Sequence, residues 1–81
     1  MRKSIGSAQY DRFLATLKAA RESAGLTQAE LAGRLRATQS FVSKCERGER
    51  RIDVIELRAW CAALGVSFPK FCAGLDRALR G

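Results

Sequence analysis

Glycines divide this chain of 81 residues into short stretches that carry apolar residues at helical spacing. Gly25, Gly48 and Gly65 each follow such a stretch. A glycine just past the end of a helix can adopt the left-handed backbone conformation that closes the last turn. These positions therefore predict where helices end, and they limit each helix to a few turns.

Residues that cap helix N-termini stand at the starts of the stretches. Thr27 is followed three residues later by Glu30, the spacing of a capping box, in which each side chain bonds the backbone N–H of the other residue. Thr38, Asp53 and Ser67 also have side chains that accept from free N–H groups in a first helical turn. The caps therefore predict where helices begin.

No segment shows the sustained two-residue alternation of a half-buried strand, so we expect no strands. The expected helices cover residues 9–24, 28–35, 39–47 and 54–64, with a fifth beginning at about residue 68. The sequence thus predicts an all-α fold, a compact five-helix bundle. Residues 9–81 form a single domain in this interpretation, and residues 1–8, which are polar and basic, form a flexible N-terminal arm.

The chain is strongly basic. Its 15 lysine and arginine residues outnumber its 8 aspartate and glutamate residues, which gives a formal net charge of +7 at pH 7. A small domain with this excess of positive charge expects a polyanionic partner, and nucleic acid is the commonest one.

The groups that most catalytic and metal sites need are missing. The chain has no histidine, which excludes histidine dyads and histidine metal ligands. Cys45, Cys61 and Cys72 form no Cys-x-x-Cys pair, so we expect free core cysteines in a reducing compartment. We therefore expect neither an enzyme nor a cofactor. No apolar run fits a membrane span or a signal peptide, which predicts a cytoplasmic protein without a membrane partner.

The stretch Leu26–Arg47 predicts two short helices joined by a tight turn. Such a pair crosses steeply and can place its second helix in the major groove of DNA. With Val42 and Cys45 facing inward, the outward positions of the second helix are Gln39, Ser40, Phe41, Ser43 and Lys44. Most of these side chains can hydrogen-bond to base edges, since glutamine suits adenine and lysine suits guanine. We therefore expect this group to contact bases.

Three motifs in this order resemble the Cro and phage-repressor type of helix-turn-helix, also called the XRE family. They read AARESAGLTQAELAGRL, TQSFVSKCERG and LRAWCAALGVS, and the resemblance covers residues 17–68. It implies the five-helix fold, DNA binding and a homodimer on an inverted repeat.

The resemblance also implies roles for single residues. Gln28 matches a glutamine that binds a DNA phosphate at the start of a helix, where the helix dipole favours anions. We place Thr38 with it among the phosphate contacts. Arg21 and Glu46 match a salt bridge that positions the second helix of the motif.

Two residues depart from the family pattern. Arg36 stands where the turn usually has glycine, so either Arg36 is left-handed, at a cost of roughly 1 kcal/mol, or the turn has another shape. Phe41 is large for an exposed position, and it either contacts a thymine methyl group or folds back onto the protein.

Positive charge surrounds the expected reading helix. Residues 34–51 contain Arg34, Arg36, Lys44, Arg47, Arg50 and Arg51, opposed by Glu46 and Glu49. Such a run is often only a solvated surface, but its position here favours phosphate contact. The best phosphate candidates are Arg47, Arg50 and Arg51.

The last helix carries more apolar surface than closing a small bundle requires. Its apolar residues are Phe68, Phe71, Leu75 and Leu79. An exposed apolar patch marks a partner site, so we expect a two-fold homodimer through this helix.

These features predict a sequence-specific transcriptional regulator, a repressor that binds double-stranded DNA. The alternative is an antitoxin or controller-type protein that also binds a protein partner such as a toxin. A purely structural DNA-bridging role ranks third.

Overall fold

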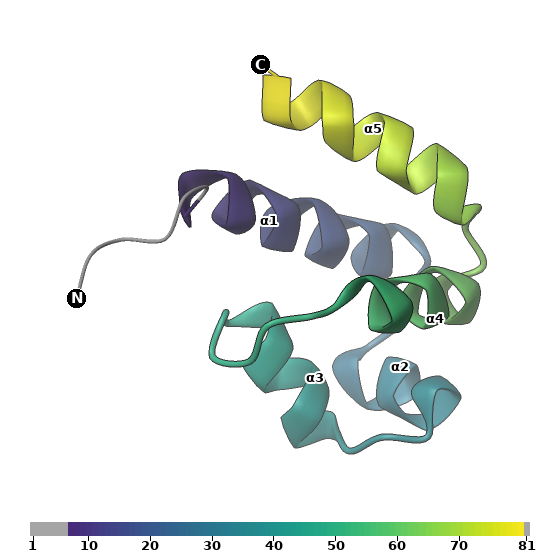
Figure 1. The fold of residues 1–81 in the computed structure, drawn as a ribbon. Helices are drawn as coiled ribbons and strands as arrows, with labels where there is room; N and C mark the ends of the chain where they lie inside the picture. The colour runs from purple at the N-terminus through teal and green to yellow at the C-terminus, as the bar shows by residue number, and fades with distance from the viewer. Residues whose placement is uncertain (1–6, 81) are drawn as a thin grey trace.

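A computed structural model describes residues 7–80 and places five helices there. They are α1 (Ser7–Ser23), α2 (Gln28–Leu35), α3 (Gln39–Glu46), α4 (Val54–Leu64) and α5 (Phe68–Arg80), as Figure 1 shows. No strand occurs within residues 7–80. The predicted all-α, five-helix fold is confirmed.

The predicted capping residues begin their helices. Thr27 Oγ1 accepts from the Glu30 N–H at 3.0 Å, and Glu30 Oε1 accepts from the Thr27 N–H at 2.8 Å, which completes the predicted capping box. The Thr38 and Ser67 hydroxyls each accept from the backbone N–H three residues further on, at 3.0 and 3.3 Å. Asp53 caps α4 in the same way at 2.7 Å. Local sequence therefore sets the start of these helices.

Left-handed residues close the helices at their other ends. Gly25, Gly48 and Gly65 have φ values of 75°, 81° and 75°. Arg36, with φ 57°, ends α2 in the same conformation, and its N–H donates to the carbonyl of Gly33 at 3.2 Å. Of the two shapes considered for this turn, the left-handed one is found.

The structure differs from the sequence prediction at the ends of α1 and α3 and at one side chain. Helix α1 begins at Ser7, two residues before the predicted start, so it includes the last two residues assigned to the arm; residues 1–6 lie outside the described part of the chain. Helix α3 ends at Glu46, and Arg47 is its C-cap. Helical spacing in the sequence predicts Ile55 on the apolar face of α4 together with Trp60, but Ile55 is 74% exposed.

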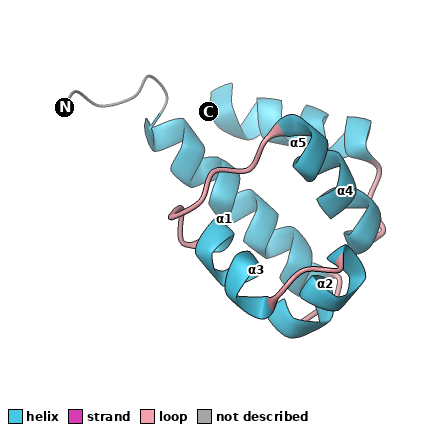
Figure 2. Ribbon diagram, turned by 60° about the horizontal axis from the view of Figure 1, so that its bottom comes forward, coloured by secondary structure: helices cyan, strands magenta, loops and turns pink. Residues whose placement is uncertain are grey.

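The core is built by four of the helices. Its most deeply buried side chains are Leu17 of α1, Leu31 of α2, Val42 and Cys45 of α3, and Trp60 and Cys61 of α4. Helix α5 contributes no fully buried residue and packs against α1 and α4. Figure 1 and Figure 2 show α2 and α3 at the end of the bundle opposite α5. The helix-turn-helix therefore occupies one end of the molecule.

The cysteines are free. Cys45 and Cys61 are buried and Cys72 is half-buried. Burial raises the pKa of the Cys45 and Cys61 thiols, which keeps them protonated at neutral pH. Their expected role as apolar core residues is thus consistent with their environment.

Candidate nucleic-acid interface

Helix α3 has one face in the core and one in solvent. Val42 and Cys45 are completely buried and fix the inward face. The polar side chains on the outward face are Gln39, Ser40 and Lys44, which are exposed, and Ser43, which is half-buried. The structure therefore brings four of the five expected base-contact residues to one surface.

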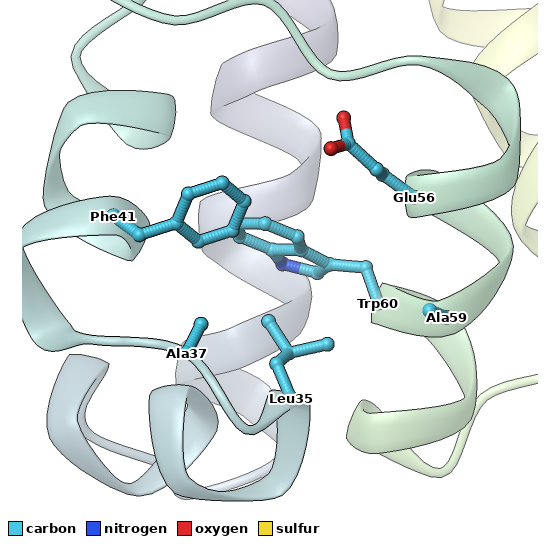
Figure 3. A pocket seen from close by; sticks show the side chains of 6 residues that line it. All are labelled: Leu35, Ala37, Phe41, Glu56, Ala59 and Trp60. Atoms are coloured by element: carbon cyan, nitrogen blue, oxygen red, sulfur yellow. The ribbon is translucent and has the colours of Figure 1, made fainter.

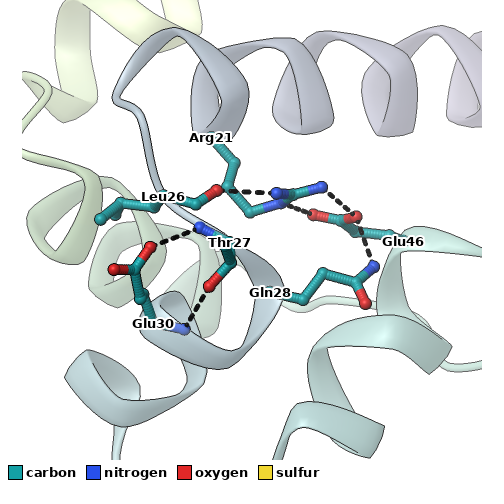
Figure 4. Close-up of polar contacts among 6 residues, drawn as sticks. All are labelled: Arg21, Leu26, Thr27, Gln28, Glu30 and Glu46. Atoms are coloured by element: carbon teal, nitrogen blue, oxygen red, sulfur yellow. Dashed lines mark hydrogen bonds and ion pairs between the residues drawn. The ribbon is translucent and has the colours of Figure 1, made fainter.

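The C-terminal end of α3 is anchored by an ion pair. Arg21 of α1 donates from Nε and Nη2 to the two carboxylate oxygens of Glu46, at 2.7 and 3.1 Å (Figure 4). Its Nη1 donates to the carbonyl of Leu26 at 2.8 Å, and Gln28 Nε2 donates to Glu46 at 2.9 Å. One carboxylate thus joins α3 to α1 and to the first residue of α2.

This ion pair is buried. The Arg21 and Glu46 side chains are 10% and 4% exposed. Burial alone raises the pKa of Glu46, but the hydrogen bonds from Arg21 and Gln28 outweigh it and hold that pKa below its ordinary value. The hydrogen bond to Glu46 also raises the pKa of Arg21. Both partners therefore stay charged inside the protein.

The N-termini of α2 and α3 leave backbone N–H groups for an anion. Thr27 and Thr38 satisfy the third N–H of each helix, which leaves the first two free of intrahelical partners. Gln28 uses one amide hydrogen on Glu46 and keeps the other hydrogen and the carbonyl oxygen. The contact between Gln28 and phosphate stays a prediction.

Phe41 folds back onto the protein. Its ring centroid lies 6.1 Å from that of Trp60, with the ring planes tilted by 47°, and Figure 3 shows the two rings next to each other. The Arg50 guanidinium covers the ring at 4.9 Å from the centroid. Of the two roles considered for Phe41, the structure shows intramolecular packing, and a contact between Phe41 and a base stays a prediction.

Arg47 follows directly on α3 and is paired at the surface. Its Nε donates to Glu49 at 2.8 Å, and its Nη1 bonds the Ser43 hydroxyl. Both members of the Arg47–Glu49 pair are 54% exposed. The hydrogen bond from Arg47 lowers the pKa of Glu49. An exposed pair of this kind exchanges partners easily.

The side chains of Arg50 and Arg51 also make contacts within the protein. Arg50 donates from its two terminal nitrogens to the two oxygens of Glu56, each at 2.8 Å, and this contact lowers the pKa of Glu56. The Arg51 guanidinium lies 4.0 Å from the centroid of the Tyr10 ring. Both arginines therefore stabilise the loop between α3 and α4, a role beyond the predicted phosphate contact.

Two of the residues that contact the loop between α3 and α4 were not predicted from the sequence. Glu56 completes a second capping box with Asp53, since Glu56 Oε1 accepts from the Asp53 N–H at 3.0 Å. Its spacing from Asp53 equals that of the Thr27 box, so the signal was present. Tyr10 accepts from the Ile52 N–H at 3.0 Å, and no local pattern indicates that contact.

The apolar side chains of α5 are partly used inside the molecule. Phe68, Phe71 and Leu75 pack against the core and, with Leu79, are half-buried. Phe68 also borders a hollow whose other wall includes Ile55 of α4. Val54 and Ile55 are 63% and 74% exposed. The apolar surface therefore continues from α5 to the start of α4.

Within residues 7–80, no helix is long and apolar enough to cross a bilayer. The same residues hold no cluster of three or more potential metal ligands. The fold and the exposed face of α3 define the class of the protein, which is a helix-turn-helix DNA-binding regulator.

The chain belongs to the XRE type of the helix-turn-helix family, whose model matches residues 17–71. An XRE-family like protein from Pseudomonas syringae pv. tomato str. DC3000 is 45% identical, with a TM-score of 0.85 over 90% of this chain and 89% of that one. The clp gene regulator ClgR from C. glutamicum is 27% identical, with a TM-score of 0.74 over 86% and 91%.

A further solved structure supports the fold alone. The wild-type restriction-modification controller protein C.Esp1396I is 23% identical, with a TM-score of 0.83 over 98% of this chain and 100% of that one. No curated protein matches the chain.

Proposed function

We propose that this protein is a sequence-specific repressor of transcription that binds an inverted-repeat operator as a homodimer, with α3 in the major groove. The observation that carries the proposal is the exposed polar face of α3 on a helix whose other end is fixed by the buried Arg21–Glu46 pair. Base reading requires side chains held within about 0.5 Å of their productive positions, and such an anchor supplies this rigidity. A cytoplasmic location is part of this proposal.

Base contact is assigned to the four polar residues of the exposed face, Gln39, Ser40, Ser43 and Lys44. A bidentate contact of this kind contributes about 1–3 kcal/mol of discrimination between bases. Lys44 lies beyond the first turn of α3 and suits a guanine. The Ser43 hydroxyl already accepts a hydrogen bond from Arg47, so DNA would contact these two side chains together.

Phosphate contact is assigned to Gln28, Thr38, Arg47, Arg50 and Arg51. The Thr38 oxygen accepts from a backbone N–H and keeps its own hydrogen for a phosphate oxygen. Arg47 exchanges its partner more readily than Arg50, because both members of the Arg47–Glu49 pair are 54% exposed, against 45% and 28% for Arg50 and Glu56. Arg50 has a structural role as well, so its replacement is expected to affect both stability and binding.

Dimerisation is assigned to the α5 face formed by Phe68, Phe71, Leu75 and Leu79. The exposed start of α4 extends this surface, since Ile55 and Phe68 border one hollow. A two-fold axis through this surface would present two copies of α3 to successive major grooves, about 34 Å apart. Ile55→Asp should therefore shift the protein towards monomer in sedimentation velocity.

Selection of bound duplexes from a random DNA pool at near-physiological salt tests the proposal. Recovery of an inverted repeat with half-sites about one helical turn apart is the expected result. Lys44→Ala should relax the consensus at one position per half-site. Lys70→Ala, at an exposed lysine of α5, is the matched control and should leave the consensus unchanged. Weak, salt-sensitive binding without a consensus would contradict sequence-specific function.

The alternative is an antitoxin or controller-type protein that binds a second protein. The exposed Val54 and Ile55 favour a partner of some kind at α4. A homodimer that is abolished by Ile55→Asp supports the first proposal. A wild-type protein that stays monomeric at tens of micromolar would favour the second.

A further inference from the structure

A hollow of about 200 Å³ lies between the α2–α3 turn, α3 and α4. Its walls are formed by Leu35, Ala37, Phe41, Glu56, Ala59 and Trp60, and Figure 3 shows these side chains around a common space. Phe41 belongs to the first turn of α3, so one wall of the hollow is part of the proposed reading helix.

Trp60, which lines the hollow, has a buried polar atom without a partner. Trp60 is 1% exposed, and among the described residues its indole N–H has no hydrogen-bond acceptor. Figure 3 shows the nitrogen on the edge of the indole that faces Leu35 and Ala37. Buried N–H groups are almost always bonded, so this one points to an acceptor that the protein itself does not supply.

The other polar side chain that lines the hollow, Glu56, already has hydrogen-bond partners within the protein. One carboxylate oxygen of Glu56 accepts from Arg50 and from the Asp53 N–H, and the other accepts from Arg50. The charges of Glu56 and Arg50 therefore compensate each other. A ligand of this hollow meets largely apolar walls, and the unsatisfied Trp60 N–H is covered by neighbouring atoms.

We propose that the hollow binds a small uncharged organic molecule with an apolar body and a carbonyl oxygen that accepts from the Trp60 N–H. A cavity of about 150 Å³ is enough for benzene, and drug-sized ligands need about 300 Å³ or more, so the ligand class is a single ring with a carbonyl group. Because Phe41 forms one wall, we expect a ligand that reaches the Trp60 N–H also to shift α3. This second consequence, an effect on DNA affinity, rests on the proposed function.

Acetophenone and α-methylstyrene form a matched pair of probes, since they differ only in a methylene group in place of the carbonyl oxygen. Trp60 is the one tryptophan of the chain, so its indole N–H gives a single assigned signal in ¹⁵N-labelled protein. Acetophenone should move that signal downfield with a saturable Kd on the order of 1 mM, the range expected of a ligand of this size. α-Methylstyrene should bind at least fivefold more weakly and produce no downfield shift.

Two variants on one helix locate the site. Ala59→Leu places a larger side chain in the hollow and should weaken acetophenone binding at least fivefold. Ala62→Leu, three residues further along α4, borders the other hollow and should leave binding within twofold. Both alanines are exposed, and circular dichroism verifies that both variants fold. Should either fail to fold, Ala59→Met and Ala62→Met repeat the comparison.

Several outcomes would overturn the proposal. They are no saturable shift with wild-type protein, equal affinity for the two probes, or unchanged acetophenone binding in the Ala59 variant. The probe titration involves no DNA, so its result stands whether or not a DNA site is found. Once a DNA site has been identified, saturating acetophenone should change the affinity of wild type for that site at least twofold. The change for the Ala59 variant should be smaller.

Discussion

Two arginine–glutamate pairs lie at the same end of α3 and differ mainly in burial. Arg21 and Glu46 meet at 2.7 Å with side chains 10% and 4% exposed, whereas Arg47 and Glu49 meet at 2.8 Å with side chains 54% exposed. Their contact distances are almost equal, so geometry alone does not distinguish them. The difference is in what happens when one partner is removed.

Removal of one partner from a buried pair leaves a charge without solvent or counter-charge, which is strongly unfavourable. At the surface, water replaces the missing partner and the loss is small. The buried pair is therefore suited to holding α3 in place, and the exposed pair is suited to exchanging a carboxylate for a DNA phosphate.

The largest expected effect follows from breaking the buried pair. Arg21→Met should lower the free energy of unfolding by about 3–5 kcal/mol, because Glu46 then lies buried without its cation. Arg47→Met should lower it by less than about 0.5 kcal/mol. Urea unfolding at pH 7 measures both. Equal losses in the two variants would show that burial does not separate the pairs.

Acid should reduce the difference between wild type and Arg21→Met. The pKa of Glu46 is lowered in the folded protein, so its contribution is fully present above its unfolded pKa of about 4.3 and is lost as pH falls through the folded value. Urea unfolding between pH 7 and pH 3 should show the gap between the two proteins narrowing, first as the unpaired Glu46 of the variant takes up a proton and then, below about pH 4, as wild type loses its ion pair. A gap that stays constant over this range would mean that the charge of Glu46 contributes nothing.

The exposed pair should matter for DNA rather than for folding. Arg47→Ala should weaken binding to all sequences by a similar factor and reduce the salt slope by about one unit, since one phosphate contact is lost. Glu49→Gln should strengthen binding roughly two- to fivefold, because it frees Arg47 from its partner. Fluorescence anisotropy titrations at several salt concentrations measure both. An unchanged slope in Arg47→Ala would remove this residue from the phosphate contacts.

The last expected effect is also small, concerns the backbone and serves to calibrate the others. Arg36 is left-handed at φ 57°, a conformation that glycine adopts without cost. Arg36→Gly should raise the free energy of unfolding by about 1 kcal/mol. Thermal and urea unfolding measure the gain. A loss of stability would show that the Arg36 side chain makes a contribution larger than its strain.

Much of the fold is readable from local sequence, because caps and glycine ends depend on neighbours in the chain. Thr27, Thr38 and Gly65 are found in the roles predicted for them. The prediction for Ile55 was wrong because helical spacing shows which residues share a face of the helix. It does not show whether another part of the protein covers that face. At 74% exposure, Ile55 lies outside the core that Trp60, on the same helix, enters.

The candidate site was only partly predictable. The exposure of Gln39 and Lys44 follows from the helical position of the buried Val42. The partners of Arg50 do not follow, since Glu56 and Phe41 approach it only once the loop has closed. The unpartnered Trp60 N–H has no sequence signal at all, because it depends on where every nearby carbonyl lies.

Tyr10 ties the loop after α3 back to the first helix: its hydroxyl accepts from the Ile52 N–H while Arg51 covers its ring. The same aromatic side chain thus provides an acceptor for one residue and a face for its neighbour. Because one side chain makes both contacts, we expect changes at these positions to be linked in evolution despite their separation in the sequence. A lineage that replaces Tyr10 by an aliphatic residue should also change position 51, and the order in which the two changes arise would be visible in reconstructed ancestors.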